Sequence, residues 1–449
     1  MSLLSPLNNM IEKAIMGSPA AMAYLKYRNA KAWELKDAFE HPDTHDCSLK
    51  RLQALAHILQ YARDHVPYYR KHIPAGDITP ENAESILHQI PPLTKTIIRN
   101  EKEQIYSDEL NNVCRYWSNT GGSTGEPLHF PVSRNTGFEN ELALYLLQGW
   151  KLHDRIISFD GAKIPDDEIA RGLYYTKRIG ALELPYGNIR FSTLFLEEQY
   201  LPDVFQQLDS LRPDFLRGYS SAFIILSHYI LKNNLQLTKK LKGLYFTSEL
   251  CPETELPFIR EAFQCHVFGQ YGNTEATQYG LAQDGKTYLC SPTFGYVEIL
   301  DPDGTPVKEG ECGEVVSTGF HNYAMPFIRY RTGDLAEYGG VKNGFVILRS
   351  LQGRTLDFIV NADNKRIYLV GFIFGRHMKA FNHLASWQLE QSKPGLIQMK
   401  IVRGEGYGDE DAKELADHFA SVQVKVDISY VDHIERTMRG KQKFLIQHL

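Results

Sequence analysis

The sequence predicts an α/β protein with a largely parallel sheet, and three observations lead to this fold class. Strand-like apolar runs at 156–159 and 244–246 alternate with segments whose apolar residues recur at helical spacing. A second alternation of strands and a helix between 397 and 430 predicts a small α+β domain. The length of 449 residues, with 43% apolar and 23% charged residues, is typical of a globular protein with two or three domains.

Apolar residues at helical spacing mark the helices that we expect in the first half of the chain. Between Ser48 and Val66 they fall three or four positions apart, on one face of a helix that Pro67 ends. The segments 138–150 and 201–211 repeat this spacing. The sequence therefore predicts a helical N-terminal region followed by layered α/β structure.

The C-terminal part has the pattern of a smaller unit. Residues 362–365 read Ala-Asp-Asn-Lys between two short strand-like runs, which is typical of a β-hairpin. A helix is predicted over 414–422. The strand-like segments are 358–360, 366–369, 397–401 and 422–430.

Composition and charge exclude several classes of partner. The formal net charge is −5 and Lys and Arg form no dense run, whereas a nucleic-acid partner requires a basic face. Residues 1–23 have no basic region before an apolar core, and no apolar run approaches the roughly 20 residues of a membrane span. We expect a cytoplasmic protein that binds small molecules, neither nucleic acid nor membrane, and a homodimer is compatible with the sequence.

The cysteines are scattered without a C-x-x-C pair. We therefore expect neither a disulfide framework nor a zinc site, and we expect each cysteine to be a small buried hydrophobic residue. The six cysteines are Cys47, Cys114, Cys251, Cys265, Cys290 and Cys312.

A glycine-rich stretch from Ser118 to Pro127 predicts a phosphate-binding loop. Its three glycines allow backbone N–H groups to point inward, and the interleaved Ser and Thr hydroxyls add further donors. A solvated surface turn is the structural alternative. The residues assigned to the phosphates are Ser118, Thr120, Gly121, Gly122, Ser123, Thr124 and Gly125.

Two downstream clusters combine groups that suit a nucleotide. The segment 269–275, Gly-Gln-Tyr-Gly-Asn-Thr-Glu, offers an aromatic ring for a base, a hydroxyl group and a carboxylate for Mg²⁺. The segment 330–334, Tyr-Arg-Thr-Gly-Asp, ends in a carboxylate, which can accept hydrogen bonds from two vicinal hydroxyls at once. An aromatic residue and an acid on a turn can also be purely structural, and the basic tail 436–441 can be a solvated face.

These motifs, in this order, resemble those of the adenylate-forming enzymes, which include acyl-CoA synthetases, firefly luciferase and peptide-synthetase adenylation domains. The glycine-rich stretch resembles their phosphate-binding motif, 271–275 resembles Y-G-x-T-E, and 330–334 is identical to Y-R-T-G-D. The last of these is the most specific match.

Further matches point to one branch of that family. The segments 65–70, His-Val-Pro-Tyr-Tyr-Arg, and 93–99, Leu-Thr-Lys-Thr-Ile-Ile-Arg, resemble the N-terminal V-P-F/Y-Y-R and L-T-K-x-x-[IL]-R segments of the phenylacetate-CoA ligase branch. The segment 358–363 is similar to relatives that are encoded with capsular-polysaccharide genes.

The resemblance implies a division into two domains. A large ATP- and acyl-binding domain over 1–352 is followed by a small, mobile lid domain over 353–449. The segment 353–357 resembles the hinge between them, with Arg354 and Asp357 as hinge residues, although many relatives have an acid where Leu356 stands. The segment 436–441, Arg-Thr-Met-Arg-Gly-Lys, resembles P-R-T-x-x-G-K, with Glu435 in place of the proline.

The resemblance also implies the role of each site residue. Lys441, Thr274 and Glu275 are implied to be catalytic, with Glu275 as the Mg²⁺ ligand. Asp334 is implied to accept hydrogen bonds from the ribose, and the segment 247–249 to lie against the adenine. The implied ATP- or AMP-binding residues beyond the loop are Glu249, Gln270, Tyr271, Gly272, Asp334 and Arg354. The acyl pocket is expected from Phe138, Tyr145, Gly218, Tyr219 and Phe246, each of which can equally belong to the core.

The implied reaction is adenylation of a carboxylate by ATP and Mg²⁺, followed by transfer of the acyl group from acyl-AMP. Coenzyme A is the expected acceptor. An amine or a sugar amine is the alternative, because relatives that use CoA usually keep a glycine shortly after the hinge, in a loop that meets CoA, and this chain has no glycine at that place. A non-catalytic nucleotide- or acyl-binding relative is a third interpretation, which the retained Glu275, Asp334 and Lys441 disfavour.

One further pattern is expected to be incidental. Residues 280–287 fit the P-loop pattern G-x-x-x-x-G-K-T, but that motif functions between a buried strand and a helix N-terminus. Here Asp284-Gly285 predicts a hairpin turn before a strand at 288–292.

Overall fold

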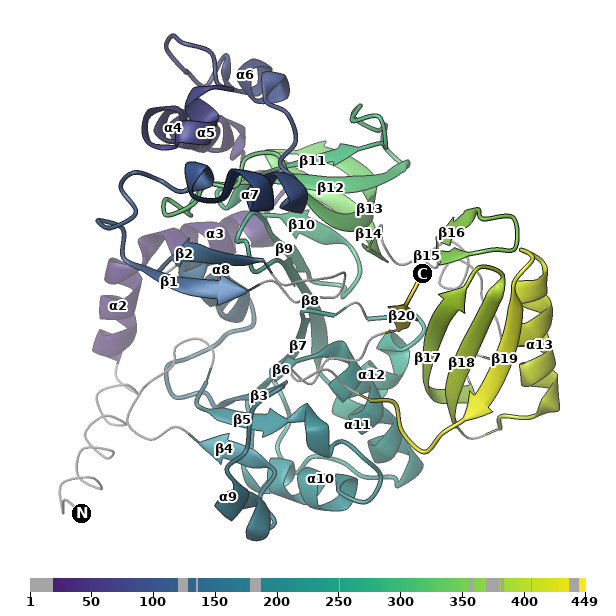
Figure 1. Ribbon diagram of the computed structural model, residues 1–449. Coiled ribbons are helices and arrows are strands. Elements are labelled where there is room, and N and C mark those ends of the chain that lie inside the picture. Colours follow the sequence, from purple (N-terminus) through teal and green to yellow (C-terminus); the bar gives the residue numbers. More distant parts are fainter. Residues whose placement is uncertain are drawn as a thin grey trace.

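The computed structural model describes residues 19–119, 128–134, 136–177, 187–249, 251–354, 358–368, 380, 383–404, 406–435 and 444–449. These residues form a large α/β body with a smaller C-terminal α+β domain at its side (Figure 1). The predicted fold class is therefore confirmed, whereas the boundary at 352/353 stays a prediction.

A twelve-stranded mixed sheet forms the centre of the large body, in the order β11-β12-β13-β14-β10-β9-β8-β7-β6-β3-β5-β4. Only its central strands β5, β3, β6, β7 and β8 pair in parallel. The prediction of a largely parallel sheet is wrong outside this centre, because hairpins connect many of the remaining strands. The strands are β3 (Ile156–Asp160), β4 (Tyr175–Lys177), β5 (Ile189–Ser192), β6 (Phe215–Gly218), β7 (Gly243–Thr247), β8 (His266–Gly272), β9 (Tyr279–Ala282), β10 (Tyr288–Cys290), β11 (Gly295–Leu300), β12 (Cys312–Gly319), β13 (Tyr330–Lys342) and β14 (Phe345–Arg354).

Helices cover both faces of the parallel centre. On one face α8 (Phe138–Leu146) packs with α3 (Ala30–Glu40) over aromatic residues of β6, β7 and β8. On the other face α10 (Leu201–Ser210), α11 (Ser220–Lys232) and α12 (Leu256–Phe263) enclose a second apolar cluster. The helices predicted near 138 and 201 are therefore present, and α8 ends four residues before the predicted Trp150.

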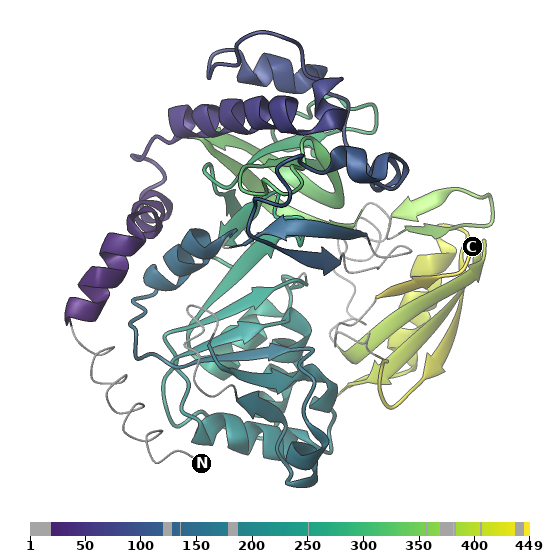
Figure 2. The same cartoon turned by 60° about the vertical axis from the view of Figure 1, so that its left-hand side comes forward.

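The helices between Ser48 and Glu101, α4 to α7, lie over the antiparallel half of the sheet (Figure 2). The predicted helix is α4 (Ser48–His65), which ends directly before Pro67, and Pro67 begins a short helix of its own. The other elements of the large body are α2 (Pro19–Arg28), α5 (Pro67–Arg70), α6 (Ala83–Gln89), α7 (Lys95–Glu101), η1 (Lys102–Ile105), α9 (Asp166–Ala170), η2 (Thr193–Phe195) and the two-stranded ribbon of β1 (Arg115–Asn119) and β2 (His129–Ser133).

The C-terminal domain has its own sheet, in the order β19-β18-β17-β20, and its own apolar core around Trp387, Leu389 and Ile401. The predicted hairpin at 362–365 connects β15 (Phe358–Val360) to β16 (Arg366–Tyr368), with Asn364 at a φ of 60°. The remaining elements are β17 (Leu384–Lys393), β18 (Leu396–Arg403), α13 (Asp409–Ala420), β19 (Lys425–Tyr430) and β20 (Leu445–Gln447).

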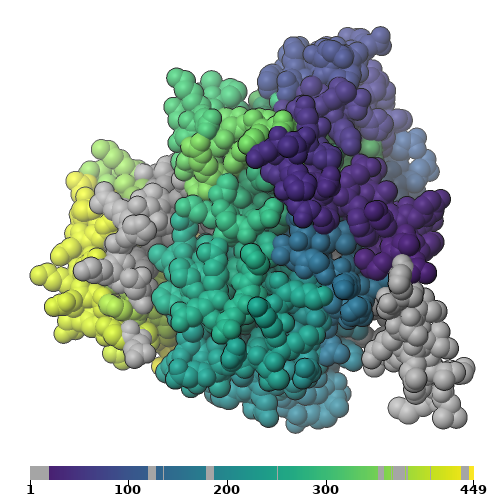
Figure 3. All heavy atoms as spheres, turned by 180° about the vertical axis from the view of Figure 1, so that it is seen from behind, coloured from purple at the N-terminus to yellow at the C-terminus, as the bar shows by residue number. Residues whose placement is uncertain are grey.

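Seen from behind, the N-terminal segments and the C-terminal domain lie at opposite sides of the molecule (Figure 3). Cys47 and Cys290 are buried as expected, but Cys114 and Cys312 are exposed, so the prediction of uniformly buried cysteines is wrong. Both exposed residues lie in connections or at a strand end, where no core forms. Among the described residues, no helix has the length and apolarity that a membrane span requires.

Candidate active site

A side-chain hydrogen bond joins the motif strands β8 and β13. The hydroxyl of Tyr271, near the end of β8, donates to Oδ2 of Asp334 on β13 at 2.9 Å. Tyr271 is buried, and burial, together with the charge of Asp334, raises its pKa, so the hydroxyl stays protonated and remains a donor. The bond fixes one oxygen of the Asp334 carboxylate beside Tyr271 of β8, the strand at which the parallel part of the sheet ends.

The backbone of the Y-R-T-G-D segment is shaped to present Asp334. Gly333 has a φ of 78°, a conformation that favours glycine, and its N–H donates to Oε1 of Glu314 at 3.1 Å. Burial raises the pKa of Glu314, and Arg331, whose Nε lies 3.0 Å from Oε2, partly offsets this shift. Asp334 is also the register partner of Arg354, so the predicted hinge begins beside this carboxylate.

A tight turn follows β8 and places its residues on two sides. Asn273 closes the turn by accepting the N–H of Thr277 at 3.0 Å through Oδ1. Gly272 and Thr274 are exposed, whereas Glu275 is only 7% exposed. The turn therefore leaves Gly272 and Thr274 at the surface and directs Glu275 into the protein.

Glu275 is paired inside the protein. Its Oε1 accepts a hydrogen bond of 2.6 Å from the hydroxyl of Tyr330, the first residue of the Y-R-T-G-D segment. Within the described part of the chain, the groups of three side chains suited to a metal ion do not include Glu275. One carboxylate with one committed oxygen fits Mg²⁺ only if phosphate oxygens and water supply the other ligands. The residues present thus fit an ion that arrives with ATP.

The N-terminal motifs hold the strand that carries Asp334. The backbone of Leu93 pairs with the start of β13, donating to the carbonyl of Arg329 at 2.8 Å and accepting from Arg331 at 2.9 Å. The hydroxyl of Tyr69 donates to the carbonyl of Pro326 at 3.1 Å and accepts from the N–H of Ile328 at 3.1 Å. Both segments therefore have a structural function that the sequence patterns did not reveal.

A buried polar network lies beneath Gln270. Glu141 of α8 is 2% exposed and accepts hydrogen bonds from Gln270 Nε2 at 2.8 Å and from the hydroxyl of Tyr279 at 3.0 Å. Its other oxygen lies 2.9 Å from a guanidinium nitrogen of Arg217 on β6. No pattern in the sequence indicated this network. The only signal was an acidic residue inside a predicted apolar helix.

Glu249 lies at the end of the neighbouring strand β7. Its Oε2 accepts the N–H of Ser221, in the first turn of α11, at 3.1 Å. Ser248, beside it, has a φ of 68°, which is uncommon for a residue other than glycine. The helix N-terminus and the unusual backbone conformation fix this carboxylate at the carboxyl edge of the sheet.

The expected acyl-pocket residues fall into two groups. Tyr145 and Phe246 are at most 1% exposed and pack in the two apolar clusters of the large body. Phe138 and Tyr219 are partly exposed. Gly218 ends β6 where a Cβ atom would lie 2.2 Å from the carbonyl oxygen of Phe159, so the close strand packing itself requires glycine.

Several predicted residues lie outside the described part of the chain. These are Thr120, Gly121, Gly122, Ser123, Thr124, Gly125, Asp357 and Lys441. Ser118 is described: it lies on β1, opposite Phe130 of β2, directly before the loop. Arg354 is described as part of β14 through its backbone.

The P-loop-like segment forms a hairpin. Residues 279–282 are β9, residues 288–290 are the antiparallel β10, and Gly285 has a φ of 75° between them. The amine of Lys286 lies 2.8 Å from a carboxylate oxygen of Glu253 at the surface. The prediction that this segment is not a nucleotide-binding P-loop is consistent with this hairpin, which has no helix after the glycine.

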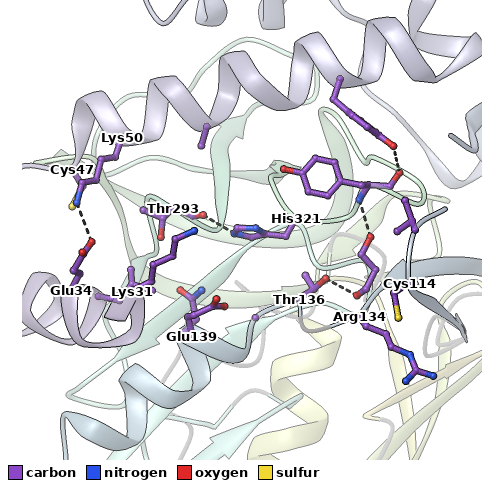
Figure 4. Close-up of a pocket in the computed structure, with 18 of the residues that line it drawn as sticks. Lys31, Glu34, Cys47, Lys50, Cys114, Arg134, Thr136, Glu139, Thr293 and His321 are labelled. Carbon is purple, nitrogen blue, oxygen red and sulfur yellow. Dashed lines mark hydrogen bonds and ion pairs between the residues drawn. The ribbon is translucent and has the colours of Figure 1, made fainter. Parts of the chain in front are cut away.

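A separate cavity of about 860 Å³ lies between α3, α4 and α8 (Figure 4). His321 lies on its wall, where a ring nitrogen is 2.8 Å from the carbonyl of Thr293, and burial lowers its pKa. Lys31 and Glu139 lie nearby with opposite charges. None of the predicted site residues that the structure describes lines this cavity.

Comparisons with known proteins agree with the motif analysis. Residues 359–448 match the family model of the CapK C-terminal domain. The chain is 20% identical to the protein CapK of Staphylococcus aureus over 97% of this chain and 96% of that protein. It is 23% identical to the phenylacetate-coenzyme A ligase of Escherichia coli (strain K12) over 82% of this chain and 84% of the ligase.

Solved structures share the fold. The crystal structure of 2-hydroxyisobutyryl-CoA ligase in the postadenylation state, in complex with R3-HIB-AMP, has a TM-score of 0.64 at 18% identity and covers 89% of this chain and 88% of that chain. The same ligase with 2-HIB-AMP and CoA in the thioesterification state has a TM-score of 0.54 at 20% identity, with 91% and 90% covered.

Proposed function

Since the chain is a homologue of CapK and of the phenylacetate-CoA ligases and has the fold of adenylate-forming acyl-CoA ligases, we propose that it activates a carboxylic acid with ATP and transfers the acyl group to coenzyme A. The observation that carries the proposal is the contact of Tyr271 with Asp334. It brings together two motifs, far apart in sequence, whose groups suit a base and a ribose.

In the proposed complex, the vicinal ribose hydroxyls donate to the carboxylate of Asp334. This carboxylate can accept further hydrogen bonds while Tyr271 holds it, because an ionised carboxylate offers about four acceptor positions. The glycine-rich loop next to Ser118 then receives the β- and γ-phosphates. Thr274, exposed on the turn after β8, contacts an oxygen of the α-phosphate or of the acyl group.

The first step forms a bond between a substrate carboxylate oxygen and the α-phosphorus and breaks the bond to the bridging oxygen of pyrophosphate. No general base is required, because the substrate carboxylic acid is ionised near pH 7. The protein must instead align two mutually repelling anions and neutralise the developing charge. We assign this neutralisation to Lys441. Mg²⁺, when bound with ATP beside Glu275, supplies charge stabilisation to the phosphates.

In the second step the sulfur of CoA bonds to the acyl carbon and AMP leaves with the electron pair of the broken C–O bond. We propose that the C-terminal domain turns about the segment from Arg354 to Asp357 between the two steps, removing Lys441 and admitting the acceptor. The register pairing of Arg354 with Asp334 supports this pivot, because the proposed hinge then begins beside the carboxylate that we propose for the ribose.

An amine or sugar-amine acceptor is the second candidate. It is favoured by the absence of the post-hinge glycine and by the match of residues 359–448 to the CapK C-terminal domain. Both candidates share the adenylation step and differ only in the group that attacks the acyl carbon.

The test measures pyrophosphate and AMP release over a panel of carboxylic acids, with and without CoA. Acid-dependent pyrophosphate release is expected with the wild-type protein, and the Asp334→Ala variant is expected to require a higher ATP concentration for it. AMP release that depends on CoA supports thioester formation, whereas AMP release that depends on an added amine or amino sugar supports the second candidate. ATP binding without pyrophosphate release from any acid would favour a non-catalytic relative.

A further inference from the structure

The carboxyl edge of the central parallel strands carries a polar cluster that combines Glu249, which the resemblance assigned to the adenine, with three residues outside the nucleotide motifs. We define the strand-end cluster as Asp160 at the end of β3, Arg190 on β5, Tyr219 after β6 and Glu249 after β7. These strands are parallel and adjacent, so their ends meet at one edge of the sheet (Figure 1). In such sheets, ligands bind outside the carboxyl ends of the strands.

The two faces of these strands differ in polarity. Ser158 of β3 is the register partner of Arg190 on β5 and of Arg217 on β6, so the three residues form a polar row on one face. Arg217 contacts Glu141, which places this row beneath α8. The opposite face is apolar, with Ile157 among its buried residues. Parallel strands that are covered on both faces are normally apolar on both, so the polar row requires a reason.

Asp160 has one satisfied oxygen and one unsatisfied oxygen. Its Oδ2 accepts from Nε of Arg190 at 2.9 Å and also lies 2.9 Å from a terminal nitrogen of the same guanidinium. Its Oδ1 is buried and has no hydrogen-bond partner among the described residues. A buried carboxylate oxygen without a donor is costly, so this atom is an acceptor in need of a donor.

Glu249, on the other side of the cluster, also has one paired and one unpaired carboxylate oxygen. Its Oε2 accepts from the backbone of Ser221, while its Oε1 is buried without a partner in the part of the chain that the structure describes. The hydroxyl of Ser221 is likewise buried without a hydrogen-bond partner among the described residues. Tyr219 lies between the two acids: burial raises its pKa, and the charges of Asp160 and Glu249 raise it further, so its hydroxyl stays protonated.

We propose that the strand-end cluster receives the acyl part of the substrate and selects a carboxylic acid that carries a hydroxyl or amino group away from the reacting carboxylate. This inference rests on the proposed function. Unpaired acceptors on Asp160 and Glu249 require donors, which unsubstituted alkyl and aryl acids lack. The cluster contains two carboxylates and one guanidinium, so it is net negative and disfavours a second carboxylate or a phosphate on the substrate.

The test compares acids of equal size that differ only in CH₃, OH or NH₃⁺ at carbons 2 to 4. Acid-dependent pyrophosphate release should show a kcat/KM at least about tenfold higher for the best hydroxy or amino acid than for its methyl counterpart. In Asp160→Asn this preference should fall to within about threefold, because the amide loses the charge and presents N–H groups toward the donor, while the KM for ATP stays unchanged. Glu253→Gln, an acid-to-amide change at the exposed pair with Lys286, is the matched control and should keep the preference.

Binding measurements keep the test decisive if no acid in the panel is a substrate. Acyl-sulfamoyl adenosines that carry the same CH₃, OH or NH₃⁺ groups occupy the site without chemistry, and calorimetry should show the same order of affinity. Equal affinity for methyl and hydroxyl analogues would overturn the inference. So would a rise in the KM for ATP in Asp160→Asn, because the free acceptors would then serve the adenine amine. Failure of every analogue to bind would instead reject the proposed function itself.

Discussion

We call Tyr271, Glu275, Tyr330 and Asp334 the nucleotide end, because they belong to the motifs that we propose to hold ATP. The nucleotide end and the strand-end cluster differ in how far the protein itself supplies hydrogen-bond partners for their carboxylates. At the nucleotide end, Asp334 is held by Tyr271 and Glu275 by Tyr330, in bonds of 2.9 and 2.6 Å. In the strand-end cluster, Asp160 and Glu249 each keep a buried oxygen without a partner among the described residues. The carboxylates of the first region are each held by a tyrosine, whereas those of the second each keep an acceptor for a ligand.

This difference separates what a fold family shares from what one member binds. Groups that hold a common nucleotide can be pre-paired by the protein, because their ligand does not change. Groups that recognise a particular acid are left open in the free protein, since a partner from the protein would compete with the substrate. Experiments that affect one region and spare the other test this division.

The largest effect is expected at Glu141, because its buried network connects Gln270 of β8 with Arg217 of β6. Glu141→Ala removes the partner of Arg217 and the acceptor for Gln270 and Tyr279, which should lower the free energy of unfolding by about 3 kcal/mol. Chemical denaturation measures this change. Glu253→Ala, at an exposed ion pair, is the control and should change stability by less than about 0.5 kcal/mol. A loss below about 1 kcal/mol in Glu141→Ala would show that the network does not stabilise the fold.

Lys441 tests whether the nucleotide end works in two states. Lys441→Ala should slow acyl-AMP formation about a hundredfold or more, the scale seen when one preorganised charge donor is removed, with the fold intact. Supplied with chemically made acyl-AMP, the same variant should transfer the acyl group at close to the wild-type rate. Loss of both half-reactions together would argue against the domain rotation. Loss of neither would transfer the role to Lys443 or another cation.

Asp334 tests the assignment of the ribose site. Asp334→Ala removes a charge-assisted hydrogen bond and should weaken ATP binding by about 1.5–3 kcal/mol in calorimetry. The preference among hydroxyl, amino and methyl acids should persist, because Asp334 belongs to the nucleotide end. A variant that keeps its ATP affinity but loses that preference would reverse the two assignments.

Glu275 tests whether the metal enters with ATP. Glu275→Gln keeps the size and an acceptor for Tyr330 but removes the charge that a hard cation requires, so Mg²⁺ affinity in pyrophosphate exchange should fall at least about tenfold. Tyr330→Phe removes only the hydroxyl and is the control for the lost hydrogen bond. Equal metal dependence in wild type and Glu275→Gln would remove Glu275 from the metal site.

The sequence indicated candidate residues for the nucleotide end but none of the contacts in the strand-end cluster, for a physical reason. Tyr271, Glu275 and Asp334 belong to contiguous motifs, so their chemistry is visible without the fold, and the structure joins two of these motifs directly. The strand-end cluster is assembled from separate strands. No short pattern connects Asp160 to Arg190, and only the parallel register brings them together.

The sheet shows the same limit. Alternation of helices and strands indicated the parallel centre correctly, but it could not show that hairpins extend the sheet on one side with antiparallel strands. The structural role of Tyr69 was equally hidden, since its partners Pro326 and Ile328 lie far along the chain. Local patterns report local structure, whereas these contacts depend on tertiary packing.

The smallest effect is expected at Lys286, in the segment that fits the P-loop pattern. A P-loop lysine contacts phosphates, but here the segment turns between two antiparallel strands and Lys286 pairs with Glu253, with side chains 46% and 56% exposed. Exposed pairs contribute roughly 0–1 kcal/mol, so Lys286→Ala should leave both ATP affinity and stability within about 0.5 kcal/mol of wild type. Calorimetry beside Asp334→Ala provides the comparison. If Lys286→Ala weakened ATP binding more than Asp334→Ala, the nucleotide would bind at the hairpin. The assignment of ATP to the nucleotide end and of the acid to the strand-end cluster would then be wrong.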